Sequence, residues 1–233
     1  MQNNYVFKST EKLAKLSRFI LWVCLIYQIP AMWGNYQLAE VLKKIQAKAF
    51  ESEEAMMAAA TQADGIQQMF GGIGLLIGLF VIIFVGRWIY RSAVNAWSMG
   101  IQNISSTPKW GIFYFIIPIV CLYKPYVFMR ELWACFSTEH KDAEWKELSA
   151  PAIMKIWWAS YLLSGIINQT CFRISMSTEN IPAMINITTA YQITSIMAIA
   201  ECILFILIIN SIEKRQQTYL SKMNTKPEPV EQV

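Results

Sequence analysis

One acidic residue, Glu201, lies inside the long apolar stretch AIAECILFILIIN. An ionised carboxylate in the middle of a membrane span costs several kcal/mol, so we expect this group to be neutral, hydrogen-bonded or turned toward a cavity. Asn35 and Asn168 also lie in apolar segments, and we predict them as hydrogen-bonding partners of Glu201, at about 0.6–2 kcal/mol per contact. Two roles stay open: a contact that packs helices, or a carboxyl group on an ion or proton path.

A second set of polar side chains flanks the apolar segments and is predicted to form one cytoplasmic patch: Arg87, Arg91, Asn95, Lys124, Arg130 and Glu131. The first three are spaced by four residues and therefore share one face of a helix. The patch is suited to an anionic headgroup or ligand. The alternative is structural, with an Arg–Glu ion pair and with Asn95 capping loop backbone.

The sequence offers little for catalysis or for a metal. Its 5 cysteines are scattered without a CxxC pair, and its single histidine, His140, lies in a charged loop. It contains no HExxH, GxSxG or Walker loop. We therefore expect inert thiols, no metal, no cofactor and no enzymatic activity.

The composition indicates which environment positions these residues. Hydrophobic residues make up 55% of the 233 residues and charged residues 15%, whereas a soluble domain carries about 25% charged residues. Such a chain needs lipid as its solvent and is typical of a multi-pass membrane protein. The net charge of +4 is small, so the basic residues indicate topology rather than nucleic-acid binding.

Four segments reach the roughly 20 residues that a helix needs to cross a bilayer. They are residues 17–38, 70–90, 153–174 and 188–212. Residues 1–16 are predicted as a basic cytoplasmic N-terminus, 17–212 as a single membrane domain, and 213–233 as a partly disordered cytoplasmic tail. Residues 39–69, rich in Ala, Glu, Lys and Gln, are predicted as two extracytoplasmic helical arms.

The remaining apolar segment, residues 110–136, is broken by Pro118 and Pro125. If residues 110–123 crossed the membrane, 8 Lys and Arg residues would face the cytoplasm and the other 12 of the 20 would face outward. If the segment instead enters and returns, the cytoplasmic side holds 16 and the outer side 4. The positive-inside rule favours the second arrangement.

The prolines agree with this result. Pro118 would remove a helical hydrogen bond in the middle of the run, whereas Pro125 suits the first turn of a new helix. We therefore predict an all-α integral membrane protein with four transmembrane helices, a proline-broken re-entrant or interfacial hairpin, and both termini in the cytoplasm.

The central part of the chain also resembles a known family. The stretch GRWIYRSAVNAWSMG, the box of Pro118, Pro125, Arg130, Glu131 and Trp133, and the later WW pair resemble the bacterial membrane family catalogued as domain of unknown function 4328. The resemblance covers residues 75–210 and leaves the N-terminal arms and the tail outside. It implies a multi-pass protein of the bacterial cytoplasmic (inner) membrane and no established activity.

Two functions are weighed on these grounds. The first is a non-catalytic integral membrane protein that acts through contacts with lipid, a membrane-protein partner or further copies of itself. The alternative is a small ion, proton or solute transporter or channel subunit that uses Glu201. Four spans are few for a self-contained transporter, and no inverted repeat is evident.

Overall fold

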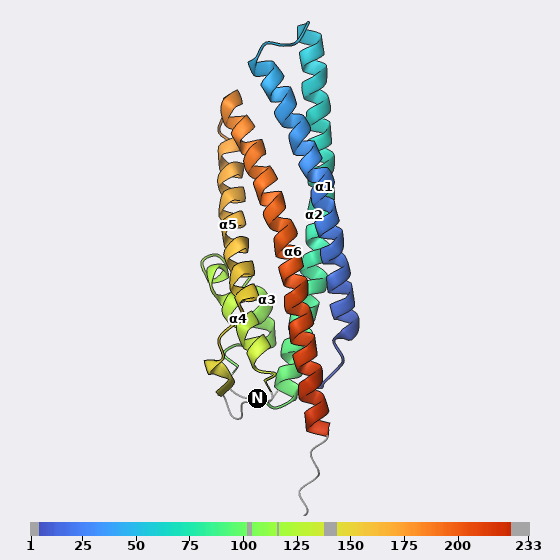
Figure 1. Ribbon diagram of the computed structural model, residues 1–233, viewed down its shortest axis with the longest axis vertical. Coiled ribbons are helices and arrows are strands. Elements are labelled where there is room, and N and C mark those ends of the chain that lie inside the picture. The colour runs from blue at the N-terminus through green and yellow to red at the C-terminus, as the bar shows by residue number, and fades with distance from the viewer. Residues whose placement is uncertain (1–4, 102–103, 116, 138–143, 225–233) are drawn as a thin grey trace, which may run out of the picture. The chain divides into compact units, whose positions relative to one another are not determined.

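All regular elements in the described part of the chain are helices (Figure 1). The computed structural model describes residues 5–101, 104–115, 117–137 and 144–224. The elements are α1 (Glu11–Gln46), α2 (Glu53–Ser98), α3 (Pro108–Phe113), the 3₁₀ turn η1 (Val120–Leu122), α4 (Lys124–Ala134), the 3₁₀ turn η2 (Glu144–Glu147), α5 (Ala152–Ser175) and α6 (Ile181–Asn224). The prediction of an all-helical protein is confirmed.

Local sequence signals mark several helix ends. The Ser52 hydroxyl accepts a hydrogen bond from the Ala55 amide at 3.1 Å and so caps α2, whose first turn holds two glutamates. The Asn180 side chain caps α6 in the same way, through the Ala183 amide at 3.1 Å. Beyond the last turn of α2, Gly100 has a φ of +72°, a left-handed conformation that glycine adopts without steric cost.

Three helices are long and apolar enough to cross a membrane: α1, α2 and α6. Within α2 only 6% of the most apolar window is buried, and large side chains such as Leu75 (67% exposed) and Ile82 (63% exposed) lie on its surface. Water would penalise this exposure heavily, whereas hydrocarbon would not. The predicted segment 153–174 forms the 24-residue helix α5.

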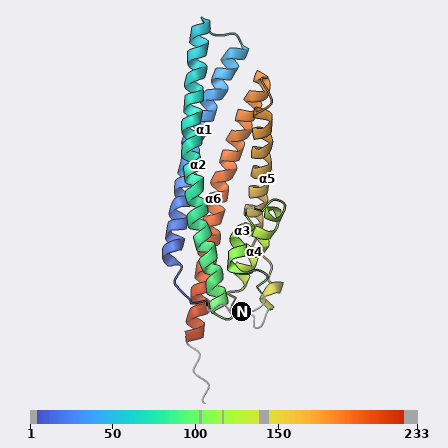
Figure 2. The ribbon, with the colours of Figure 1, turned by 180° about the vertical axis from the view of Figure 1, so that it is seen from behind.

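The described chain divides into two compact units, each built from separate stretches of sequence. Unit 1 comprises Met1–Arg18, Phe84–Lys155 and Ile206–Val233, and unit 2 comprises Phe19–Ile83 and Ile156–Phe205. In unit 2, α1 lies beside α2 and α5 lies beside α6, as both views show (Figures 1 and 2). The Tyr27 hydroxyl joins the first pair by donating to the Phe70 carbonyl at 2.6 Å.

The proline-broken segment in unit 1 is a chain of short helices. The helix α3 ends at Phe113, η1 follows, and α4 begins at Lys124 with Pro125 in its first turn, as the sequence predicts. Gly111 allows α3 to approach α4 closely, because a Cβ at this position would overlap the ring of Phe128. On the other side, Trp133 Nε1 donates to Ser211 Oγ of α6 at 2.9 Å.

The predicted arms and tail lie largely within the long helices. Because α1 continues to Gln46 and α2 begins at Glu53, most of residues 39–69 is helical. The first part of the predicted tail 213–233 is helical, since α6 continues to Asn224. The disorder predicted for the last residues falls on 225–233, outside the described residues.

Candidate functional site

Arg91 and Asn95 hold the N-terminal segment against α2. Asn95 is fully buried and pairs with one residue of backbone: its Nδ2 donates to the Lys8 carbonyl at 2.8 Å, and its Oδ1 accepts from the Lys8 amide at 3.1 Å. Arg91 donates to the Val6 carbonyl, and burial lowers the pKa of its guanidinium. Asn95 thus caps backbone, as the structural alternative holds, but the backbone belongs to the N-terminus.

Glu131 serves a different part of unit 1. It is 5% exposed, and its Oε2 accepts hydrogen bonds from Ser105 Oγ at 2.7 Å and from the Ser105 amide at 3.2 Å. This carboxylate fixes the loop that leads into α3. Arg91 and Glu131 therefore have separate partners.

The other residues of the predicted patch lie in different surroundings. Arg87 is exposed and Arg130 is half-buried. Lys124 Nζ lies 5.7 Å from the ring centres of both Tyr114 and Tyr123, within the range of a cation–π contact. The predicted patch is thus not one site in the structure. Arg91 and Asn95 bind the N-terminal segment, Glu131 binds the loop before α3, and Lys124 lies over two aromatic rings.

A buried carboxylate that the sequence analysis missed, Glu213, lies in unit 1. Glu213 is 7% exposed; its Oε1 accepts from Trp88 Nε1 at 2.7 Å, and its Oε2 accepts from Thr10 Oγ1 at 3.0 Å. The Thr10 hydroxyl also lies 3.2 Å from Gln216 Oε1. This network joins the residue before α1 to the C-terminal parts of α2 and α6.

The sequence did carry a signal for this network. Ile209, Ile212, Glu213 and Gln216 follow the spacing of one buried helix face, but their charged neighbours suggested the start of a solvated tail. Within the described residues, Gln216 Nε2 is buried without a hydrogen-bond partner, as is Ser92 Oγ.

Glu201 lies in unit 2 and is hydrogen-bonded. Its Oε1 accepts from Ser160 Oγ of α5 at 2.9 Å, and its side chain is partly buried. The partners predicted for it, Asn35 and Asn168, have other contacts: Asn35 Oδ1 accepts from Gln67 Nε2 at 3.2 Å, and Asn168 Oδ1 accepts from Thr194 Oγ1 at 2.9 Å. The three residues therefore lie in three polar contacts instead of one.

Both asparagine contacts line a single cavity of about 360 Å³, which we call the unit 2 cavity. Its amide and hydroxyl side chains come from all four helices of the unit: Gln28, Asn35, Gln67, Asn168, Thr194 and Ser195. Tyr27, Phe70 and Tyr191 add aromatic surface. Glu201 lies three residues beyond Ala198, which also lines the cavity.

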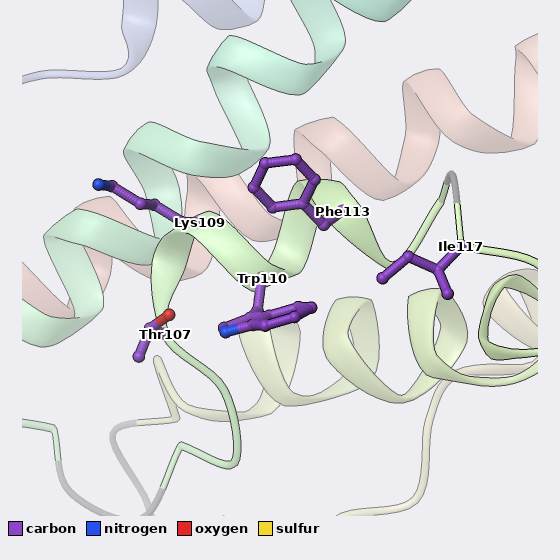
Figure 3. A pocket seen from close by; sticks show the side chains of 5 residues that line it. All are labelled: Thr107, Lys109, Trp110, Phe113 and Ile117. Atoms are coloured by element: carbon purple, nitrogen blue, oxygen red, sulfur yellow. The ribbon is translucent and has the colours of Figure 1, made fainter.

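A second hollow, of about 380 Å³, lies along α3 in unit 1. It is lined by Thr107, Lys109, Trp110, Phe113 and Ile117, whose side chains project from α3, from the residue before it and from the turn after it (Figure 3). Trp110 and Phe113 are about half exposed. Further along the same segment, Ile119 is 76% exposed.

In the ranges that the structure describes, no three His, Cys, Asp or Glu side chains come together as a metal site would require. Cys135, in α4, is buried, and this burial raises the pKa of its thiol.

These features define a class: a helical protein with three helices able to cross a membrane, polar contacts between the helices of each unit, and a proline-broken segment beside the long helices. The chain belongs to the family described as "Domain of unknown function (DUF4328)", whose model matches residues 51–214. The match begins at residue 51, whereas the resemblance in the sequence was predicted to begin at residue 75. It therefore also includes the part of the predicted arms that lies in α2. No curated protein and no solved structure matches the chain.

Proposed function

We propose that this chain is a non-catalytic, four-span protein of the bacterial cytoplasmic membrane, with both termini in the cytoplasm, and that it acts through lipid contacts of its proline-broken segment. In this proposal residues 110–123 enter the cytoplasmic leaflet and return, and α4 lies at the membrane surface. Homo-oligomers or a membrane-protein partner are compatible with this role.

The observation that carries the proposal is the exposure of large apolar side chains along this segment. They are Trp110 (50%), Phe113 (52%), Ile119 (76%), Leu122 (51%) and Tyr123 (52%). Aromatic residues with a lysine nearby are typical of the zone where a membrane meets water. An apolar surface of this kind is costly in water and favourable in lipid.

The backbone at the end of the hairpin supports this role. Ile119 has a φ of +68° and a ψ of −50°, the strained conformation of a γ-turn, which costs a β-branched residue free energy. A glycine at this position would relieve that strain. Ile119 is nevertheless the most exposed of the large apolar side chains named above. This exposure fits a residue that contacts lipid.

A spin label tests the depth of this residue. In vesicles, with the natural cysteines replaced by alanine, a nitroxide on Ile119→Cys should collide with oxygen, which concentrates in lipid, and should be shielded from an aqueous nickel chelate. A label on Lys146→Cys, an exposed position in η2, should show the opposite pattern. Equal access of the nickel chelate to both labels would contradict the proposal.

A second candidate function is ion or proton transport through Glu201. The hydrogen bond between Ser160 and Glu201 favours it, because a carboxyl group paired with a hydroxyl inside an apolar helix is a recurrent feature of proton paths. The same contact also serves simply to join α5 to α6. A flux measurement, described in the Discussion, separates the two roles.

A further inference from the structure

We propose that the unit 2 cavity is a binding site for a small uncharged molecule that carries hydroxyl or amide groups. This inference goes beyond the lipid contacts of the proline-broken segment and does not depend on them. It rests on the position of two hydrogen-bonded pairs, on the charge of the cavity wall and on the cavity's size.

The two pairs line the cavity from different helices. The Asn35–Gln67 pair joins α1 to α2, and the Asn168–Thr194 pair joins α5 to α6. In each pair the asparagine accepts through Oδ1, which leaves its Nδ2 group able to donate. If these residues served only to join neighbouring helices, no open space between the two pairs would be needed.

The surroundings make such a space costly unless polar molecules fill it. The cavity is lined by parts of α1, α2 and α6, the three helices able to cross a membrane. Amide and hydroxyl groups facing hydrocarbon without partners lose several kcal/mol each. Four of the six side chains are paired with one another, but each amide keeps donors or acceptors beyond these pairs. Water or a hydrogen-bonding solute in the cavity would satisfy them.

The charge and size of the cavity limit the solute. Among the described residues that line it there is no Asp, Glu, Lys or Arg, so a charged solute would lose its hydration without gaining an opposite charge. Amide and hydroxyl groups can both donate and accept, which suits hydroxyl and amide groups of a ligand. A volume of about 360 Å³ lies in the usual range for small-molecule sites, roughly 300–1,000 Å³.

Two matched cysteines test whether the cavity is open to water. Ala198 lines the cavity, whereas Ala200 is an exposed residue on another face of α6. In nanodiscs, with the natural cysteines replaced by alanine, Ala198→Cys should react with a neutral methanethiosulfonate reagent and Ala200→Cys should not, because a thiol in lipid does not ionise. An unreactive Ala198→Cys, repeated with Ala31→Cys on the opposite wall, would overturn the proposal.

Protection by a solute then tests binding. N-acetylglucosamine, glucose and glycerol are the uncharged probes, and glucosamine is the cationic counterpart of the first. A bound probe should slow the reaction of Ala198→Cys by about tenfold at ten times its dissociation constant, and glucosamine should protect far less. Adding Asn168→Ala, which removes one amide from the cavity wall and puts a good helix former in its place, should remove the protection. Equal protection by glucosamine, or protection by none of the uncharged probes, would overturn the proposal.

Discussion

The indole nitrogen of Trp88 in α2 donates a hydrogen bond of 2.7 Å to the carboxylate of Glu213 in α6. Glu213 lies 125 positions further along the chain. A buried carboxylate of this kind needs its donors, because its desolvation is otherwise uncompensated. The contact therefore ties the C-terminal part of α2 to that of α6 in unit 1, and Thr10 adds the residue that precedes α1.

Removing the indole donor should destabilise unit 1. Trp88→Phe leaves the Glu213 carboxylate with fewer partners, and we expect the free energy of unfolding in mixed micelles to fall by about 2–3 kcal/mol. Combined with Glu213→Gln, the effects should be less than additive. As a control, Trp22→Phe changes an exposed residue and should stay within about 0.5 kcal/mol of the wild type. Strict additivity would contradict the contact.

The Arg91 and Glu131 side chains should act independently. Arg91 binds the Val6 carbonyl and Glu131 binds Ser105, so Arg91→Ala and Glu131→Ala each remove a different contact. We expect their effects on thermal unfolding to add within about 0.5 kcal/mol. An interaction energy well above this value would show that the two residues are a pair after all.

The approach of α3 to α4 depends on Gly111. Gly111→Ala forces a Cβ into the ring of Phe128, and overpacking of this kind typically costs about 1–3 kcal/mol of unfolding free energy. Gly86→Ala is the matched control, since its Cβ would lie 4.0 Å from Ile112, an ordinary contact. Adding Phe128→Leu should recover part of the loss from Gly111→Ala; no recovery would mean that Phe128 is not the obstacle.

The Glu201 carboxyl group separates packing from transport. Glu201→Gln keeps an acceptor for Ser160 and should fold normally, whereas Glu201→Leu should lose about 0.6–2 kcal/mol. We expect no proton or ion flux from folded wild-type protein in proteoliposomes. Flux in the wild type that disappears in a well-folded glutamine variant, which cannot titrate, would establish the transport role instead.

Local patterns in the sequence predicted the elements better than their contacts. The apolar segments predicted the long helices, and Pro125 predicted the start of α4. Both predictions succeeded because a helix and its first turn depend on residues that are neighbours in the sequence. The spacing of Arg91 and Asn95 placed them on one helix face, but it could not show that the face meets the N-terminal segment. Glu213 was missed because a glutamate just beyond an apolar run looks the same whether the helix ends in water or continues into a core.

The most direct test concerns the proposal that residues 110–123 enter the membrane without crossing it. Single cysteines at Lys48 and Gln217, both exposed, should be labelled from opposite sides of the membrane by an impermeant maleimide: Lys48→Cys in intact cells, and Gln217→Cys only after the membrane is opened. This is the result that four spans with both termini in the cytoplasm predict. Labelling of both positions in intact cells would mean that residues 110–123 cross, and would contradict the account.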